Sequence, residues 1–269
     1  MSPEAGAMLD FWQEQDDRIA KVLEAHDKGE KLGENMFAAL LEQDPQRHDI
    51  TQGRLECEAK SVVGAGGETV ARALSAATFH ILDQPDVRQR LMAELHQAIP
   101  DQSNMPNLDH LSRLPYLTAC IEESLRLTYG VTERRARAYD SFPLTYDSFT
   151  IRPGTFVSMD TWDVAHDETI FPASHRFVPE RWLDNPKAPD GRSLSSYMVS
   201  FGKGTRKCVG LQLAYAELYL ALASFFRSEV GGRARLWGTD RRDVEMVRCC
   251  VVPRARKGSE GVRVVFEEG

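Results

Sequence analysis

The chain has 269 residues, of which 42% are hydrophobic and 9% aromatic, so it can bury the core of an ordinary globular protein. Its formal net charge of −7 argues against nucleic acid as a partner, because phosphate binding needs a basic face. No run of ~18 uninterrupted apolar residues marks a membrane segment, and residues 1–17 lack the features of a signal peptide. The five cysteines form no even-spaced framework, which indicates a reducing compartment. The sequence as written is therefore expected to be cytoplasmic.

Helical patterns dominate the first half of the chain. The spacing of apolar residues predicts helices over residues 11–41, with a break near residues 29–33, and over residues 52–82, 86–98 and 115–127. The second of these contains the run Gly64-Ala65-Gly66-Gly67. Each glycine inside a helix costs ~1 kcal/mol relative to alanine, so this run needs a functional or packing reason.

The second half has a different character. Residues 145–159 predict two short strands joined by the turn dipeptide Pro153-Gly154. Irregular, proline-rich chain follows to about residue 200, then a last helix over residues 211–227 and an alternating strand pattern at residues 262–266. Because no repeat or linker is visible, the sequence predicts one domain over residues 1–269, mainly α with a small β portion.

The segment with the clearest signs of a cofactor-binding site is residues 201–210, Phe-Gly-Lys-Gly-Thr-Arg-Lys-Cys-Val-Gly. Its glycines permit close backbone approach to a large planar cofactor, and amides at a helix start stabilise a thiolate at Cys208. Phe201 can shield the sulfur from water, and Arg206 can bind a carboxylate. Taken alone, these residues fit a phosphate-binding loop or a small buried cysteine equally well. No Cys-x-x-Cys pair accompanies a histidine pair, so no zinc site is predicted.

The same segment resembles a known family. It matches the haem-binding signature FxxGxRxCxG of the cytochrome P-450 family at every fixed position, and Leu213, Ala214 and Glu217 fit the family's next turns. The resemblance implies haem b (iron protoporphyrin IX) as cofactor, with the thiolate of Cys208 as the iron ligand. The further cofactor-binding residues that it implies are Phe201, Gly202, Arg206, Gly210 and Ala214.

Two more motifs are similar to the structural core of that family. Glu123 and Arg126 match its ExxR motif, and residues 177–182 resemble its PERF/PERW segment. A pair at spacing i, i+3 shares a helix face, yet an isolated exposed pair contributes only a few tenths of a kcal/mol. The resemblance implies a larger, buried network of Glu123, Arg126 and Arg181, with a structural role.

A fourth motif gives a reason for the glycine run. Residues 65–69 look like the family's [AG]Gx[DE]T, which implies that Ala65 and Gly66 leave room for dioxygen. By the same resemblance, Thr69 hydrogen-bonds dioxygen and Glu68 passes protons inward from solvent. From the residues alone, a tolerated helix kink with a solvent-facing glutamate is the alternative.

Three further residues follow the ExxR helix. By resemblance, Arg137 is expected to face a haem propionate, with Arg135 as the second choice. The alternative, that both arginines are simply exposed surface residues without a ligand, is nearly as well supported. His166 stands where relatives commonly have a histidine, but no partner is close in sequence and no role is assigned to it.

The resemblance implies a monooxygenase that takes electrons from a reductase and inserts one oxygen atom of dioxygen into a small apolar organic substrate. The residues in and around the ExxR and PERW motifs are typical of fungal members of the family and of secondary metabolism. Family members are roughly twice as long, and eukaryotic ones begin with a membrane anchor. An N-terminally truncated chain is therefore expected, with a full-length parent at the endoplasmic reticulum. The alternative is a non-catalytic haem-binding or interaction fragment without the substrate-recognition half.

Overall fold

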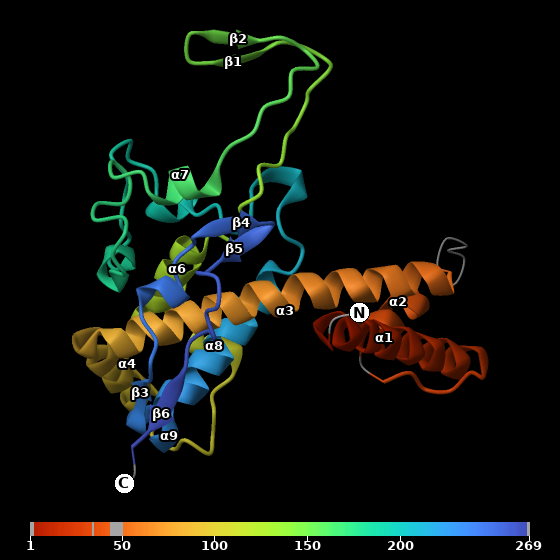
Figure 1. The fold of residues 1–269 in the computed structure, drawn as a ribbon, viewed down its shortest axis with the longest axis horizontal. Helices are drawn as coiled ribbons and strands as arrows, with labels where there is room; N and C mark the ends of the chain where they lie inside the picture. Colours follow the sequence, from red (N-terminus) through yellow and green to blue (C-terminus); the bar gives the residue numbers. More distant parts are fainter. Residues whose placement is uncertain (1–2, 34, 44–50, 268–269) are drawn as a thin grey trace. The chain divides into compact units, whose positions relative to one another are not determined.

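The computed structural model describes residues 3–33, 35–43 and 51–267 and is mainly helical (Figure 1). The α-helices are α1 (Pro3–Asp27), α2 (Met36–Gln43), α3 (Gln52–Asp83), α4 (Pro85–Ala98), α5 (Leu108–Leu111), α6 (Pro115–Thr128), α7 (Thr161–Ala165), α8 (Leu211–Arg227) and α9 (Glu229–Arg233). The 3-10 turns of this described part are η1 (Pro179–Trp182), η2 (Leu194–Tyr197), η3 (Gly204–Arg206) and η4 (Arg241–Asp243). The predicted fold class, mainly α with a small β portion, is confirmed. Within these residues, no helix has the length and apolar character needed to cross a membrane.

In the described residues, the strands form three separate antiparallel pairs. They are β1 (Leu144–Tyr146) with β2 (Phe149–Ile151), β3 (Ala234–Leu236) with β6 (Val264–Phe266), and β4 (Arg248–Cys250) with β5 (Val252–Arg254). The strand predicted near the C-terminus is therefore present as β6, where Val265 pairs with Arg235.

The first hairpin turns at a different place from the predicted one. In β1–β2, Tyr146 pairs with Phe149, so the two-residue loop is Asp147-Ser148, and Asp147 has a φ of 52°. Pro153-Gly154 follows β2, where the Gly154 amide donates to the Tyr139 carbonyl (3.0 Å). The prediction was wrong because two-residue hairpin loops favour positive φ, which aspartate tolerates and proline cannot adopt.

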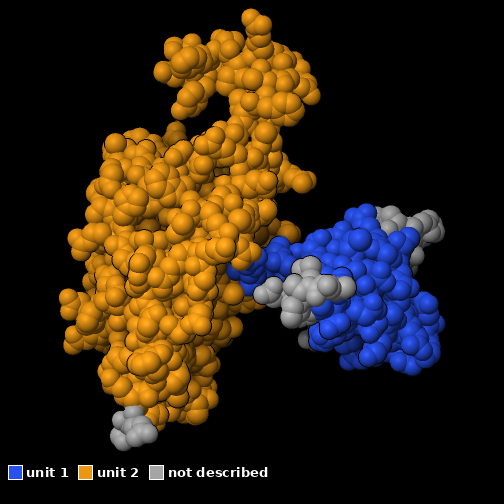
Figure 2. Space-filling model, viewed as in Figure 1, with its two compact units in different colours: residues 1–68 blue, residues 69–269 orange. Residues whose placement is uncertain are grey.

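The chain divides into two compact units, residues 1–68 and 69–269, shown in different colours in Figure 2. The boundary falls inside α3, between Glu68 and Thr69. The single domain expected from the sequence stays a prediction, and the two units are described separately below.

The first unit has a small core between α1, α2 and the start of α3. Ile19, Leu55 and Ala59 are buried there, and the Lys60 ammonium lies 2.7 Å from the Asp16 carboxylate. A Cβ at Gly64 would lie 3.4 Å from the Trp12 ring, whereas nothing would lie within 4 Å of one at Gly66 or Gly67. Of these three glycines, only Gly64 has a neighbour that an added side chain would touch, and that neighbour is the end of a side chain.

The second unit has the main hydrophobic core, formed largely by α4, α6, α8 and the part of α3 that follows Thr69. The predicted apolar face of α4 is buried, with exposed fractions of 6% at Val87 and 0% at Leu91 and Leu95. Helix α6 begins with Pro115, whose missing N–H is not needed in the first turn. It ends at Tyr129 and Gly130, which both have positive φ. The chain thus leaves α6 in a sharp turn and passes on toward the β1–β2 hairpin.

Candidate functional site

The predicted ligand, Cys208, lies in the loop between η3 and α8. Its backbone N–H donates to the Phe201 carbonyl (2.8 Å), which closes the loop. Gly202 and Gly204 have φ values of +68° and +74°, a backbone region that favours glycine. The Cys208 thiol is exposed, and α8 begins three residues later at Leu211.

The surroundings of Cys208 fit a flat apolar group that carries carboxylates. Val209, which follows Cys208 in the chain, is 100% exposed, and Leu213 in the first turn of α8 is 57% exposed, so both offer apolar surface that a ligand can cover. Arg206 is also exposed and can bind a carboxylate. A Cβ at Gly210 would lie 3.9 Å from the Cys208 sulfur, an ordinary contact distance, so Gly210 is a close neighbour of the thiol. An exposed cysteine beside such a surface fits a haem, because a cysteine sulfur is one of the side-chain ligands that can hold haem iron.

The C-terminal end of α6 holds the start of the cysteine loop. The Ser200 hydroxyl donates to the Leu125 carbonyl (2.7 Å). A Cβ at Gly130 would lie 2.0 Å from the Ser200 carbonyl oxygen, so only glycine allows the two backbones to approach this closely. The position of the loop therefore depends on the helix that carries Glu123 and Arg126.

The structure brings Glu123, Arg126 and Arg181 together. Arg126 donates to both carboxylate oxygens of Glu123 (2.9 and 2.8 Å), and the Arg181 Nε donates to Glu123 Oε1 (3.0 Å). The Arg126 Nη1 also donates to the carbonyls of Ala165 and Ser174, both at 2.7 Å. Glu123 and Arg126 are 0% and 1% exposed. The single guanidinium of Arg126 thus ties α6 to the segment that follows α7.

The charge of Glu123 is maintained despite its burial. Burial by itself raises the pKa of this carboxyl, but the hydrogen bonds and charges of Arg126 and Arg181 outweigh it and lower the pKa. The Trp182 Nε1 and the Val178 amide also donate to Glu123, both at 2.9 Å. A buried carboxylate with this many donors is a fixed anchor for η1. The i, i+3 spacing predicted the pairing of Glu123 with Arg126 and the resemblance implied the one with Arg181, but neither predicted these two additional donors.

His166 has a structural environment that the sequence did not reveal. Its Nε2 lies 2.8 Å from the Tyr129 hydroxyl and its Nδ1 lies 3.2 Å from the Ser174 hydroxyl. Its ring stacks on His175 at a centroid distance of 4.1 Å. Burial and the neighbouring His175 lower the pKa of His166 to about 4. Both ring nitrogens are thus engaged within the protein.

The other predicted site residues belong to segments other than α6, η1 and the cysteine loop. Arg135 and Arg137 are exposed, and the Arg137 backbone pairs with Val157. Ala65 and Glu68 belong to the first unit, while Thr69 begins the second and is half-buried on α3. The roles of these five residues stay predictions.

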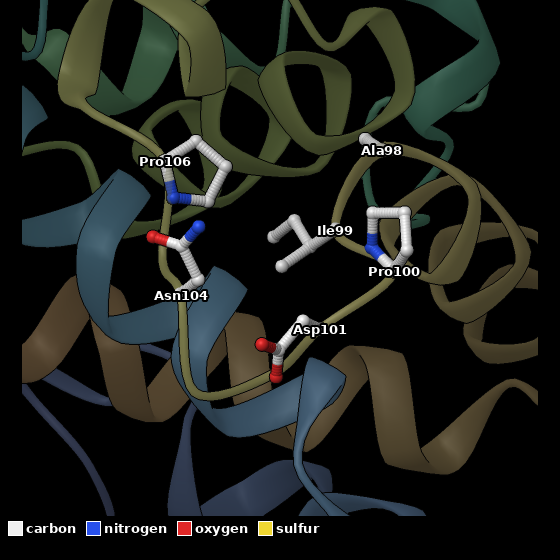
Figure 3. A pocket seen from close by; sticks show the side chains of 6 residues that line it. All are labelled: Ala98, Ile99, Pro100, Asp101, Asn104 and Pro106. Carbon is white, nitrogen blue, oxygen red and sulfur yellow. The ribbon is translucent and has the colours of Figure 1, made fainter.

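A separate surface pocket of about 410 Å³ lies in the loop after α4 (Figure 3). It is lined by Ala98, Ile99, Pro100, Asp101, Asn104 and Pro106. Asp101 already accepts hydrogen bonds from the Ser103 amide (2.9 Å) and hydroxyl (2.7 Å). This hollow contains none of the predicted site residues, so the candidate site remains the loop around Cys208.

Comparison with known proteins identifies the family. The family described as Cytochrome P-450 matches residues 2–228, and the chain belongs to it. The chain is 44% identical over 268 residues to cytochrome P-450 monooxygenase orf4 of Eupenicillium brefeldianum, which covers 98% of this chain and 52% of that protein.

Two further relatives have similar coverage. Cytochrome P-450 monooxygenase sdnE of Sordaria araneosa is 42% identical, over 85% of this chain and 44% of that protein. Tryptophan 6-hydroxylase fscE of Fusarium equiseti is 40% identical, over 86% of this chain and 44% of that protein. The chain thus spans about half the length of the curated relatives it matches. They are fungal proteins, in agreement with the fungal origin predicted from the sequence.

Proposed function

We propose that the chain is the haem-binding part of a fungal monooxygenase of secondary metabolism, which inserts one oxygen atom of dioxygen into a small apolar organic substrate. The observation that carries this proposal is the exposed Cys208 thiol, fixed by the Phe201 carbonyl at the start of α8. Haem, when bound, supplies activation of dioxygen, and a thiolate ligand favours O–O cleavage. Family membership and the monooxygenase relatives support the proposal.

Each predicted residue has a proposed task. Cys208 ligates the iron, and Arg206 and Arg137 bind the haem propionates. The Phe201 ring excludes water from the sulfur, while Gly202, Gly210 and Ala214 allow close approach of the cofactor. Ala65 leaves room for dioxygen, the Thr69 hydroxyl donates a hydrogen bond to it, and the Glu68 carboxyl moves protons from solvent. Glu123, Arg126 and Arg181 keep the cysteine loop in place.

The proposed partners are an electron-donating reductase, dioxygen and the apolar substrate, and the proposed location of a longer parent is the endoplasmic reticulum membrane. One observation favours a second function. Because the chain spans only about half of its relatives, it can also act as a haem-binding or interaction fragment without turnover. Substrate oxidation by the purified chain would favour the first function, and haem binding without oxidation the second.

The ligand assignment is tested by replacing cysteines one at a time in the haem-loaded chain. The reduced, carbon monoxide-bound form should show the red-shifted Soret band of thiolate ligation. Cys208→Ser should abolish that band because serine supplies no thiolate. Cys57→Ser, Cys120→Ser and the double Cys249→Ser/Cys250→Ser variant are the controls and should keep it. A Cys208→Ser protein with an unchanged spectrum would refute the assignment and the proposed function with it.

Thr69→Ala tests the proton path in any preparation that consumes reduced cofactor. The variant should keep the thiolate spectrum, because the hydroxyl is not needed to bind haem. It should divert reducing equivalents into hydrogen peroxide, since proton delivery of this kind contributes ~10²–10⁴-fold in rate. The measurement is the ratio of product formed to cofactor consumed, together with a peroxide assay.

Ser61→Ala is the matched control for Thr69→Ala. Ser61 lies on the same helix, and its hydroxyl donates to the Cys57 carbonyl one turn earlier (2.8 Å). Its removal should leave the ratio of product to cofactor unchanged. If Thr69→Ala behaves like Ser61→Ala, the proposed role of Thr69 is wrong.

A further inference from the structure

Tyr215 contacts both the cysteine loop and α6. It lies in the second turn of α8, and its ring packs against Phe201 at a centroid distance of 5.4 Å and an interplanar angle of 33°. Its hydroxyl donates to Glu122 Oε1 at 2.8 Å. Glu122 directly precedes Glu123 on α6. The Tyr215 side chain therefore joins its own helix, α8, to Phe201 at the start of the cysteine loop and to α6, which carries Glu123 and Arg126.

Phe201 is the part of the loop on which the position of Cys208 depends. Its carbonyl accepts the Cys208 N–H (2.8 Å), and the preceding Ser200 is anchored to the Leu125 carbonyl. The Ser200 contact fixes the entry of the chain into the loop, but it leaves the Phe201 ring to be held by other contacts. Tyr215 supplies such a contact. A shift of Phe201 changes its carbonyl position and hence the hydrogen bond of Cys208.

The contact between Tyr215 and Glu122 is suited to holding a fixed geometry. Burial raises the pKa of Glu122 above its usual range, although the Tyr215 hydrogen bond and the Lys203 charge act in the opposite direction. Burial also raises the pKa of the Tyr215 phenol, so its proton stays on the hydroxyl and is donated to the carboxyl group. The hydrogen bond is 2.8 Å long and joins two half-buried side chains. Lys203 belongs to the same loop, so Glu122 interacts with the loop in two ways.

We propose that Tyr215 is a positioning residue for Cys208: with its hydroxyl held by Glu122, its ring fixes Phe201, and Phe201 fixes the Cys208 amide. This linkage is distinct from the network of Glu123, Arg126 and Arg181, which holds α6 to η1. Only the use of the fixed cysteine, as a ligand to haem iron, rests on the proposed function. The positioning itself is a property of the protein without cofactor.

The same pair of helices provides a matched control. Tyr219 lies one turn further along α8, and its hydroxyl lies 2.9 Å from the Thr118 hydroxyl on α6. Its ring neighbours that of Tyr215 at 6.2 Å. Tyr219→Phe removes one hydroxyl from the same interface, as Tyr215→Phe does. If Tyr215 only joined α8 to α6, Tyr215→Phe and Tyr219→Phe would have the same effect on the Cys208 amide.

The first readout is hydrogen–deuterium exchange of the Cys208 backbone amide in the full chain, which requires no haem. Tyr215→Phe should make this exchange about fivefold faster, the size expected when one typical hydrogen bond is lost. Tyr219→Phe should leave it unchanged. Glu122→Gln keeps an acceptor for the phenol and should stay near wild type, whereas Glu122→Leu should behave like Tyr215→Phe.

The second readout is the reduced, carbon monoxide-bound spectrum of the haem-loaded chain. Tyr215→Phe should lower the fraction with the thiolate-type Soret band, and Tyr219→Phe should not. Equal Cys208 exchange in Tyr215→Phe and Tyr219→Phe, or no change in either, would overturn the proposal. Loss of haem binding in all proteins, with the difference in exchange retained, would overturn the proposed function and leave the positioning role supported.

Discussion

Arg126→Ala should lower the free energy of unfolding by ~3–5 kcal/mol, the usual cost of removing one partner of a buried ion pair. The change leaves the Glu123 carboxylate, which is 0% exposed, without its main counter-charge. It also deprives the carbonyls of Ala165, Ser174 and Arg176 of a donor. Because domains of this kind have only ~5–15 kcal/mol of stability, little soluble, haem-loaded protein is expected. Urea unfolding followed by circular dichroism measures the loss.

Arg113→Ala is the matched control for this experiment. Arg113 pairs with Asp109 at 2.7 Å, and the two side chains are 75% and 70% exposed. Removal of an exposed pair of this kind should change the free energy of unfolding by less than ~1 kcal/mol. Arg126→Lys keeps the charge but not the planar fork that reaches several acceptors, so it should fall between the two. A stable Arg126→Ala protein that binds haem would contradict the role assigned to the network.

Acid should destabilise the second unit through His80. This residue is 7% exposed, and its ring stacks on Phe177 at 4.8 Å. Burial lowers the pKa of His80 from 6.5 to about 4. The positive charges of Arg241 and Arg126 act in the same direction, and the negative charge of Glu123 opposes them. Between these two values the unfolded chain binds a proton that the folded chain does not. Stability is therefore complete above about pH 6.5 and falls by about 3 kcal/mol as the pH drops to about 4.

His80→Gln removes the titrating group and should flatten this part of the pH dependence. The measurement is the free energy of unfolding in urea at several pH values between 7.5 and 4.5. His110→Gln replaces an exposed histidine on α5 and should retain the wild-type slope. His166, which is only half-buried, should add a smaller dependence of the same sign. If His80→Gln and wild type lose stability in parallel, the acid sensitivity has another source.

Local patterns were sufficient to predict most helices. Helix α8 has the predicted bounds, residues 211–227, and the predicted inner face of α6, including Leu117 and Ile121, is buried. These features depend on the spacing of apolar residues within one element. The pairing of Glu123 with Arg126 also follows from i, i+3 spacing, and its connection to Arg181 was expected only by resemblance.

The remaining features depend on contacts between elements, which sequence periodicity does not describe. The stacking of His166 on His175 brings together residues of two loops, and neither ring lies on a periodic apolar face. The hydrogen bond from Tyr215 to Glu122 crosses from α8 to α6 between side chains 93 residues apart. The position of the first hairpin turn was missed for a different reason: the Pro-Gly dipeptide is a strong turn signal, but its backbone geometry does not suit a two-residue hairpin.

The β1–β2 hairpin has a practical consequence for engineering the chain. It is a two-stranded sheet on its own, and Tyr146 and Phe149 beside its turn are 73% and 66% exposed. An isolated hairpin of this size contributes little stability in water, and exposed loop tips tolerate insertions better than packed elements. The Asp147-Ser148 turn is therefore the place in the second unit where a peptide tag or a fluorescent label can be inserted with the least disturbance of the helices around Cys208.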